Sequence, residues 1–134
     1  MAQTRVEFHE GADAVTTAVD LVAAVAAEGG DALVLAADPA QAQALDGRLW
    51  DVGADVFVPH ALADDPDVAA ARVVVAAPGH PVAPCTVVLN LRQDAVEVPC
   101  SRIIELIPAD EAGKAAARAR WRSYQARGLK PEKR

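Results

Sequence analysis

Short, continuously apolar segments alternate with segments of helical spacing along most of this chain, and this alternation limits the folds open to it. Ala32–Ala36 is one such apolar segment. Strands of this kind are buried on both faces, as in a parallel sheet. Similar segments recur at 72–77, 85–91 and 102–107. Strands that alternate with helices predict an α/β fold, a three-layer sandwich around a mostly parallel central sheet.

The first fifty residues predict the order strand, helix, strand, helix. Residues 4–9 alternate apolar and polar side chains, which is typical of a strand. Residues 11–28 space their valines for one helix face, and a pair of glycines follows as a stop signal. After the apolar second strand, Asp38 precedes a proline, the pattern of an N-cap followed by the first helical position. This second helix should end near Trp50.

The rest of the chain continues the alternation with less regular connections. Val56–Val58 predicts a short third strand that ends at a proline. Residues 78–84 are rich in Pro and Gly and predict an exposed connector. A last helix is expected from about 108 to 127, with Gly128 as its C-terminal cap. The charged residues 129–134 are expected to fray.

The composition suits one domain over residues 1–134. Ala (31 residues) and Val (18) dominate the apolar side chains and aromatic residues are 4%, so helices can lie close to a sheet. No apolar segment reaches the ~20 residues that a membrane span needs, and the N-terminus lacks a signal core, so we expect a cytoplasmic protein. Cys85 and Cys100 lack metal-site or disulfide-framework spacing, and we expect both to be buried as small apolar side chains.

The motifs of the common enzyme classes are missing from the sequence. The segment after the first strand, Gly11–Thr17, has neither the glycines nor the lysine of a phosphate-binding loop, and Asp13 would repel a pyrophosphate. The three histidines have no metal-ligand spacing, and neither serine lies in a Gly-x-Ser-x-Gly turn. The expected topology is therefore Rossmann-like without a phosphate-binding loop, and we predict no catalytic residue, no cofactor and no metal.

Charge is divided unevenly along the chain. The formal net charge of −6 argues against a protein that coats nucleic acid with its whole surface. The last 22 residues, however, hold eight basic residues and one acidic residue, a charge of +7, whereas the first 112 hold five basic and 18 acidic residues, a charge of −13. The helix dipole accounts for two or three of these basic residues. The remainder predicts a docking surface for an anionic partner.

A cluster of two arginines and an indole stands out in the last helix. Arg118 and Arg122 are four residues apart, and Trp121 lies between them, so all three share one side of the helix. Such a cluster can bind a carboxylate and offer an apolar platform to the neighbouring side chain. The alternative, on the residues alone, is that Trp121 belongs to the core and both arginines are solvated.

Two stretches of the sequence carry a family resemblance. The first is Leu-Asp-Gly-Arg-Leu-Trp at 45–50, followed after six residues by Phe-Val-Pro-His-Ala-Leu at 57–62. The second is Val-Leu-Asn-Leu at 88–91 and Ile-Ile-Glu-Leu-Ile-Pro at 103–108, leading into the arginine-rich helix. Together they resemble the chi subunit of the bacterial DNA polymerase III holoenzyme, a clamp-loader accessory protein, over nearly the whole chain. Trp121 stands where this family often has tyrosine.

The resemblance implies a binding protein without catalytic activity. Chi proteins bind the acidic, phenylalanine-ended C-terminal tail of single-stranded DNA-binding protein. They also pair with the psi subunit and so link the clamp loader to coated template, which makes contact with DNA indirect. The implied tail site consists of Ile107, Arg118, Trp121 and Arg122, with Phe57 as a further wall. The resemblance leaves Trp50, Pro59 and His60 mainly to packing and turn geometry.

Two other functions stay open at this point. A degenerate α/β enzyme or nucleotide-binding regulator would use the strand-end loops at 9–17, 37–39 and 78–84, although a phosphate loop is missing. Direct DNA binding through the basic tail is the other alternative. It lacks stacking aromatic residues after Tyr124.

Overall fold

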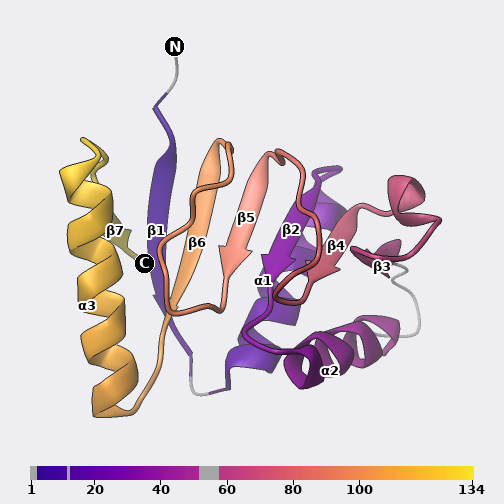
Figure 1. The fold of residues 1–134 in the computed structure, drawn as a ribbon, viewed down its shortest axis with the longest axis horizontal. Helices are drawn as coiled ribbons and strands as arrows, with labels where there is room; N and C mark the ends of the chain where they lie inside the picture. The colour runs from indigo at the N-terminus through magenta and orange to yellow at the C-terminus, as the bar shows by residue number, and fades with distance from the viewer. Residues whose placement is uncertain (1–2, 12, 52–57) are drawn as a thin grey trace.

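The structure, a computed structural model, describes residues 3–11, 13–51 and 58–134. Over these residues the chain forms seven strands and three α-helices (Figure 1). The strands are β1 (Arg5–Glu10), β2 (Ala32–Leu35), β3 (His60–Leu62), β4 (Val73–Ala76), β5 (Val87–Asn90), β6 (Arg102–Ile107) and β7 (Glu132–Lys133). The helices are α1 (Ala14–Ala27), α2 (Pro39–Trp50) and α3 (Glu111–Ala126), with a short 3-10 turn at Val68–Ala70.

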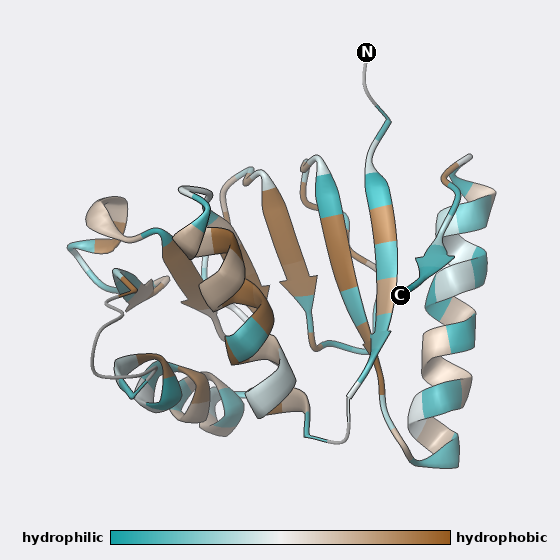
Figure 2. Ribbon diagram, turned by 180° about the vertical axis from the view of Figure 1, so that it is seen from behind, coloured by the Kyte–Doolittle hydropathy of each residue, from teal (hydrophilic) through white to brown (hydrophobic). Residues whose placement is uncertain are grey.

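All neighbouring strands run parallel in one sheet, in the order β3-β4-β2-β5-β6-β1-β7. Helices α1 and α2 pack on one face of the sheet, in a core cluster that includes Ile104, and α3 packs on the other face with Ile103. Seen from behind, the central strands are almost continuously hydrophobic, whereas β1 alternates (Figure 2). The predicted three-layer α/β sandwich with a parallel sheet is confirmed.

Each α-helix begins at an aspartate that caps its first turn. The side chain of Asp13 accepts a hydrogen bond from Val15 N, at 3.1 Å, and Asp38 accepts one from Gln41 N, at 2.7 Å. Asp110 accepts one from Gly113 N at 2.9 Å. A capping carboxylate satisfies N–H groups that have no partner within the helix. The predicted cap of the second helix is confirmed, as is its end at Trp50.

The third strand lies later in the chain than the sequence predicted. Residues 56 and 57 of the expected strand lie outside the described residues, and Val58 is buried but is not in a strand. The strand is β3, after Pro59, and it pairs with β4. The carbonyl of Pro59 accepts hydrogen bonds from Arg72 N (2.8 Å) and Val73 N (3.0 Å). Proline lacks the N–H that a strand interior uses but keeps the carbonyl, so it can begin this pairing.

The C-terminal residues also differ from the expectation that they fray. Strand β7 pairs with β1, with Glu132 beside Glu7 and Lys133 beside Phe8. The backbone N–H of Arg134 donates to Phe8 O at 2.8 Å, and the side chain of Lys133 lies 2.7 Å from Glu10. The last residues therefore extend the sheet at its edge, and β1 is covered by β7 instead of ending the sheet.

The two cysteines are free thiols and are half-buried, which corrects the expectation that both are buried. Burial raises the pKa of the Cys85 thiol, and burial together with the neighbouring Cys85 raises the pKa of the Cys100 thiol. A raised pKa keeps a thiol protonated at neutral pH and lowers its reactivity.

Two helical glycines are expected to respond in opposite ways to replacement by alanine. A Cβ at Gly47 in α2 meets no heavy atom of the described residues within 4 Å, whereas a Cβ at Gly113 in α3 would lie 2.6 Å from the ring of Pro108. Alanine is favoured over glycine in helices by up to ~1 kcal/mol, so Gly47→Ala should raise the free energy of unfolding. Gly113→Ala should lower it by about 1–2 kcal/mol because the rigid proline ring must move. Urea denaturation of both variants tests this, and equal shifts of the same sign would contradict it.

Candidate functional site

Helix α3 carries two adjacent stripes of side chains with different environments. The residues Ala117, Arg120 and Tyr124 are buried against the sheet. A second stripe, three to four residues apart along the helix, consists of Lys114, Arg118, Trp121 and Arg122. It faces a cavity of about 550 Å³ between α3 and the strands β6, β1 and β7. The residues that line this cavity are Phe8, Glu10, Ile107, Lys114, Ala117, Arg118, Trp121, Arg122 and Lys133. We call this cavity the α3 pocket.

The α3 pocket brings together most of the residues that the sequence singled out. Ile107, at the end of β6, lies in the same lining as Arg118, Trp121 and Arg122. The fifth candidate, Phe57, lies outside the described residues. Four residues that were expected to share a site therefore do line one cavity.

An aromatic contact forms part of the pocket wall. The rings of Phe8 and Trp121 are 5.0 Å apart between centroids and are tilted by 46°. Phe8 is 1% exposed, whereas Trp121 is half-buried and lines the cavity. Trp121 therefore has both roles that the sequence left open, since it packs on the core and also offers an apolar surface to the pocket.

The pocket holds four cationic side chains and one anionic side chain. Among the described residues, no carboxylate forms an ion pair with the exposed Arg118 or Arg122. Lys114 lies 3.8 Å from Glu111 in the preceding turn, and Lys133 lies 2.7 Å from Glu10. Two guanidinium groups beside an indole can take up a carboxylate and an adjoining apolar group.

Several basic residues of the C-terminal segment are engaged within the protein, which narrows the predicted docking surface. Arg120 is buried and pairs with Glu105. Arg127 lies 5.3 Å from the ring centroid of Tyr124 and donates to the carbonyl of Val96. Arg134 lies near the carboxylates of Glu7 and Glu132. We therefore restrict the predicted docking surface to the basic residues of the segment that line the α3 pocket.

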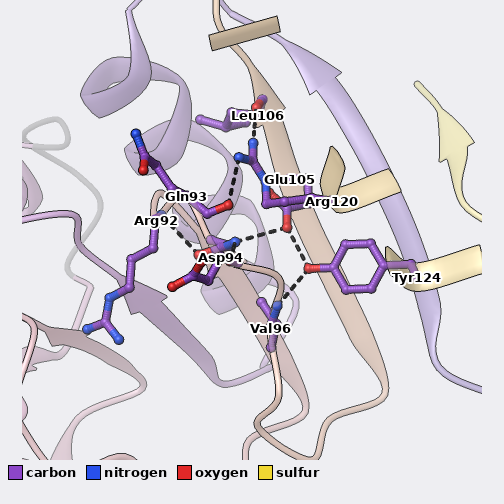
Figure 3. A network of polar contacts seen from close by, with 9 residues as sticks. Arg92, Gln93, Asp94, Val96, Glu105, Leu106, Arg120 and Tyr124 are labelled. Carbon is purple, nitrogen blue, oxygen red and sulfur yellow. Dashed lines mark hydrogen bonds and ion pairs between the residues drawn. The ribbon is translucent and has the colours of Figure 1, made fainter. Parts of the chain in front are cut away.

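A buried polar network holds α3 against the sheet (Figure 3). The guanidinium of Arg120 donates to Glu105 Oε1 at 2.8 Å and to the carbonyl of Leu106 at 3.4 Å. Tyr124 OH donates to Glu105 Oε2 at 2.5 Å and accepts from Val96 N at 2.9 Å. Asn90 also donates to Glu105, at 2.9 Å. The network fixes the rotation of α3 and with it the side of the helix that faces the pocket.

Burial dominates the protonation of this network. Glu105 is 0% exposed, and its burial raises its pKa above the ordinary value of 4.5, although Arg120 opposes this shift. Burial and the nearby Glu105 raise the pKa of Tyr124, which keeps its hydroxyl protonated as a donor. Glu105 can stay ionised at this depth only because the charge of Arg120 and the hydrogen bonds donated to its oxygens stabilise the carboxylate.

Several pocket residues and the buried ion pair were not predicted from the sequence. Phe8 and Glu10 are two positions apart on β1, so they point to the same face, and this alternation was the available signal. Lys114 is four residues before Arg118 and was a helical neighbour. Glu105, a charge within an apolar strand, was the signal for a buried partner such as Arg120. Nothing in the sequence placed Lys133 beside β1.

At the opposite edge of the sheet, the residues assigned to packing behave differently from one another. The His60 side chain is 1% exposed, and its Nδ1 lies 2.8 Å from the carbonyl of Val58. Trp50 contacts the His60 ring at 4.8 Å between centroids but is 65% exposed. The packing assignment suits His60, whereas Trp50 is largely on the surface.

Two of the strand-end loops considered for a nucleotide lead into a helix, and each of these helices already begins at a carboxylate of the protein. Asp13 and Asp38 occupy the N–H groups that a phosphate would use at α1 and α2. In the described ranges, no three His, Cys, Asp or Glu side chains are grouped to hold a metal ion. The helices of the described part are too short or too polar to cross a membrane.

Comparison with known proteins shows which family the chain resembles in sequence. Residues 3–132 match the family model described as DNA polymerase III chi subunit, HolC. The DNA polymerase III subunit chi of Pseudomonas aeruginosa is 33% identical over 92 residues, 69% of this chain and 65% of the relative, so the match spans just under two thirds of that relative. The C-terminal domain of the DEAD-box protein Dbp5 is similar in structure, with a TM-score of 0.58, 12% identity, and coverage of 98% of this chain and 91% of that one. At that identity the likeness concerns the fold alone.

Proposed function

Because the chain belongs to the DNA polymerase III chi subunit family, we propose that it is a replisome adaptor that binds the acidic C-terminal tail of single-stranded DNA-binding protein. In this role it has no catalytic activity of its own and acts in the cytoplasm as one α/β domain. It links the tail to the clamp loader through a psi subunit, and it reaches DNA only through these partners.

One observation carries the proposal: the α3 pocket combines an aromatic wall with two arginines that form no ion pair with a carboxylate among the described residues. Arg118 and Arg122 can take up the carboxylates of an acidic tail. Trp121 and Ile107 offer the apolar surface that a terminal phenylalanine ring needs. A tail that is acidic and ends in phenylalanine matches both halves of this lining, whereas an uncharged apolar peptide or a bare anion matches only one.

The proposal is tested by isothermal titration calorimetry with a synthetic acidic peptide that ends in Asp-x-Pro-Phe. We expect one binding site with a dissociation constant of about 1 μM, which corresponds to about 8 kcal/mol of binding free energy. A peptide with the same acidic residues and a C-terminal alanine should bind more weakly, because it leaves the apolar part of the pocket unfilled. The absence of binding by the first peptide would contradict the proposal.

Removal of the two pocket arginines should weaken this binding and change its salt dependence. In the double variant Arg118→Ala/Arg122→Ala we expect about tenfold weaker binding, since two exposed ion pairs of up to ~1 kcal/mol each are lost. The remaining affinity should fall less steeply with added salt, because fewer charges are left to screen. Calorimetry over a series of salt concentrations measures both effects.

A second double variant provides the control for net charge. Arg48 of α2 donates to Thr16 of α1, and Arg72 donates to the carbonyl of Gly29, so both arginines lie outside the α3 pocket. Arg48→Ala/Arg72→Ala removes the same two charges and should change the affinity less than twofold. Equal losses in the two double variants would show that the peptide responds to net charge, and would overturn this site.

A further inference from the structure

The α3 pocket contains an ion pair of its own. Lys133 Nζ lies 2.7 Å from Glu10 Oε1, and both side chains are well exposed, at 60% and 67%. Among the described residues that line the pocket, Glu10 is the one acidic side chain. One of the four pocket cations, Lys133, is therefore engaged by an anion that itself lines the pocket.

The strand register explains why this carboxylate lies in the pocket. Glu10 is the last residue of β1 and pairs with Ile107 of β6, another lining residue. Alternate residues of a strand point to the same face, so Glu10 points to the α3 side together with Phe8. Lys133 pairs with Phe8 on the other flank of β1. Glu10, and with it the ion pair, is therefore two residues along β1 from Phe8, which contacts Trp121.

The surroundings of Glu10 favour its charged form. The hydrogen bond and the charge of Lys133 lower the pKa of Glu10, and the charge of Lys114 lowers it further. Glu10 is therefore an anion at neutral pH, and it faces the same cations that an acidic ligand would approach. A carboxylate in this position competes with the ligand for Lys133 and repels it.

We propose, on the basis of the function proposed above, that Glu10 is an internal competitor of the ligand, an anion that occupies Lys133 until a ligand carboxylate takes its place. Lys133 then becomes a further binding cation of the pocket, next to Arg118 and Arg122. This exchange lowers the affinity for a ligand whose carboxylate needs Lys133, and it leaves the binding of an uncharged peptide unaffected.

The test is the variant Glu10→Gln, measured by calorimetry with the acidic peptide ending in Asp-x-Pro-Phe. We expect its affinity to rise about three- to fivefold, the equivalent of one exposed ion pair. With a peptide in which every aspartate is asparagine, the same variant should show no gain. The backbone bond from Arg134 N to Phe8 O, at 2.8 Å, does not involve either side chain, so it is available to keep β7 in place in the variant.

The matched control is Glu132→Gln. Glu132 is a neighbouring exposed carboxylate on β7 that lies outside the pocket lining and near Arg134. This variant removes the same charge and should change the affinity less than twofold. An equal gain in both variants would mean that net charge alone is responsible, and would overturn the role of Glu10.

A double-mutant cycle with Lys133→Ala completes the test. The loss of affinity on removing Lys133 should be larger in the Glu10→Gln background than in the wild type, because Lys133 is then no longer engaged. Binding by the wild type without a gain in Glu10→Gln overturns this inference and leaves the proposed function standing, as does a loss of affinity in that variant. No binding by the wild type or by any variant overturns both proposals.

Discussion

Replacing Arg120 by methionine is expected to lower the free energy of unfolding by about 3–5 kcal/mol, the usual cost of leaving a buried charge without its partner. Arg120 is 6% exposed and Glu105 is 0% exposed, and they are joined at 2.8 Å. Methionine fills much of the volume of arginine but cannot donate to Glu105. Urea denaturation of the wild type and the variant measures the difference.

The control is the same substitution two residues earlier on the helix. Arg118 is exposed, and no ion pair with a carboxylate is found for it among the described residues. Arg118→Met should therefore change the free energy of unfolding by less than about 0.5 kcal/mol. A loss below about 1 kcal/mol for Arg120→Met would contradict the view that this ion pair supports the fold.

The pH dependence of the Arg120→Met variant gives a second check with a defined sign. Burial already raises the pKa of Glu105 above 4.5, and removal of the cation should raise it further. Between the unfolded and the folded pKa, the folded state binds more protons, so the free energy of unfolding falls as the pH rises. The deficit of the variant relative to the wild type should thus be smaller at about pH 5 than at about pH 8. A larger deficit at the lower pH would exclude Glu105 as its cause.

The elements of this fold could be predicted where local signals were strong. Continuously apolar strands such as β2, and capped helix starts such as Asp38, were predicted within a residue or two. These signals depend on neighbours in the sequence, since burial on both faces and capping are local properties. The third strand was predicted before Pro59 instead of after it, because a proline at the start of a strand pairing cannot be told from one at its end by sequence alone.

The pairing of strands that are far apart in the chain could not be predicted from the sequence, and the α3 pocket depends on this pairing. Strand β1 lies between β6 and β7, and this position brings Phe8 into contact with Trp121. No local sequence pattern encodes which strands become neighbours. Lys133 enters the pocket for the same reason. Arg118 and Arg122 could be found because they share one side of one helix. The helical part of the site was therefore predictable, and its strand part was not.

Replacement of Trp121 by alanine should have the largest effect on peptide binding. Tryptophan is among the residues whose truncation most often costs 2 kcal/mol or more at an interface, which here means at least about 30-fold weaker binding. The indole is half-buried against Phe8, so its loss should also lower the free energy of unfolding, by about 1–3 kcal/mol. Binding is therefore measured by calorimetry at a temperature at which circular dichroism shows the variant to be folded.

Two further variants separate the pocket wall from the fold. Trp121→Tyr keeps an aromatic ring next to Phe8 and should retain affinity within about fivefold, because most of the apolar contact area remains. Trp50→Ala removes an indole that is 65% exposed on α2, beside His60 at the opposite edge of the sheet, and should leave the affinity unchanged. If folded Trp121→Ala bound the acidic peptide as tightly as the wild type, the terminal ring could not rest on this wall, and the arginines alone would have to hold the tail. Equal losses in the Trp50 and Trp121 variants would instead place the peptide elsewhere, since Trp50 lies beside β3 at one edge of the sheet and Trp121 contacts β1 near the other edge.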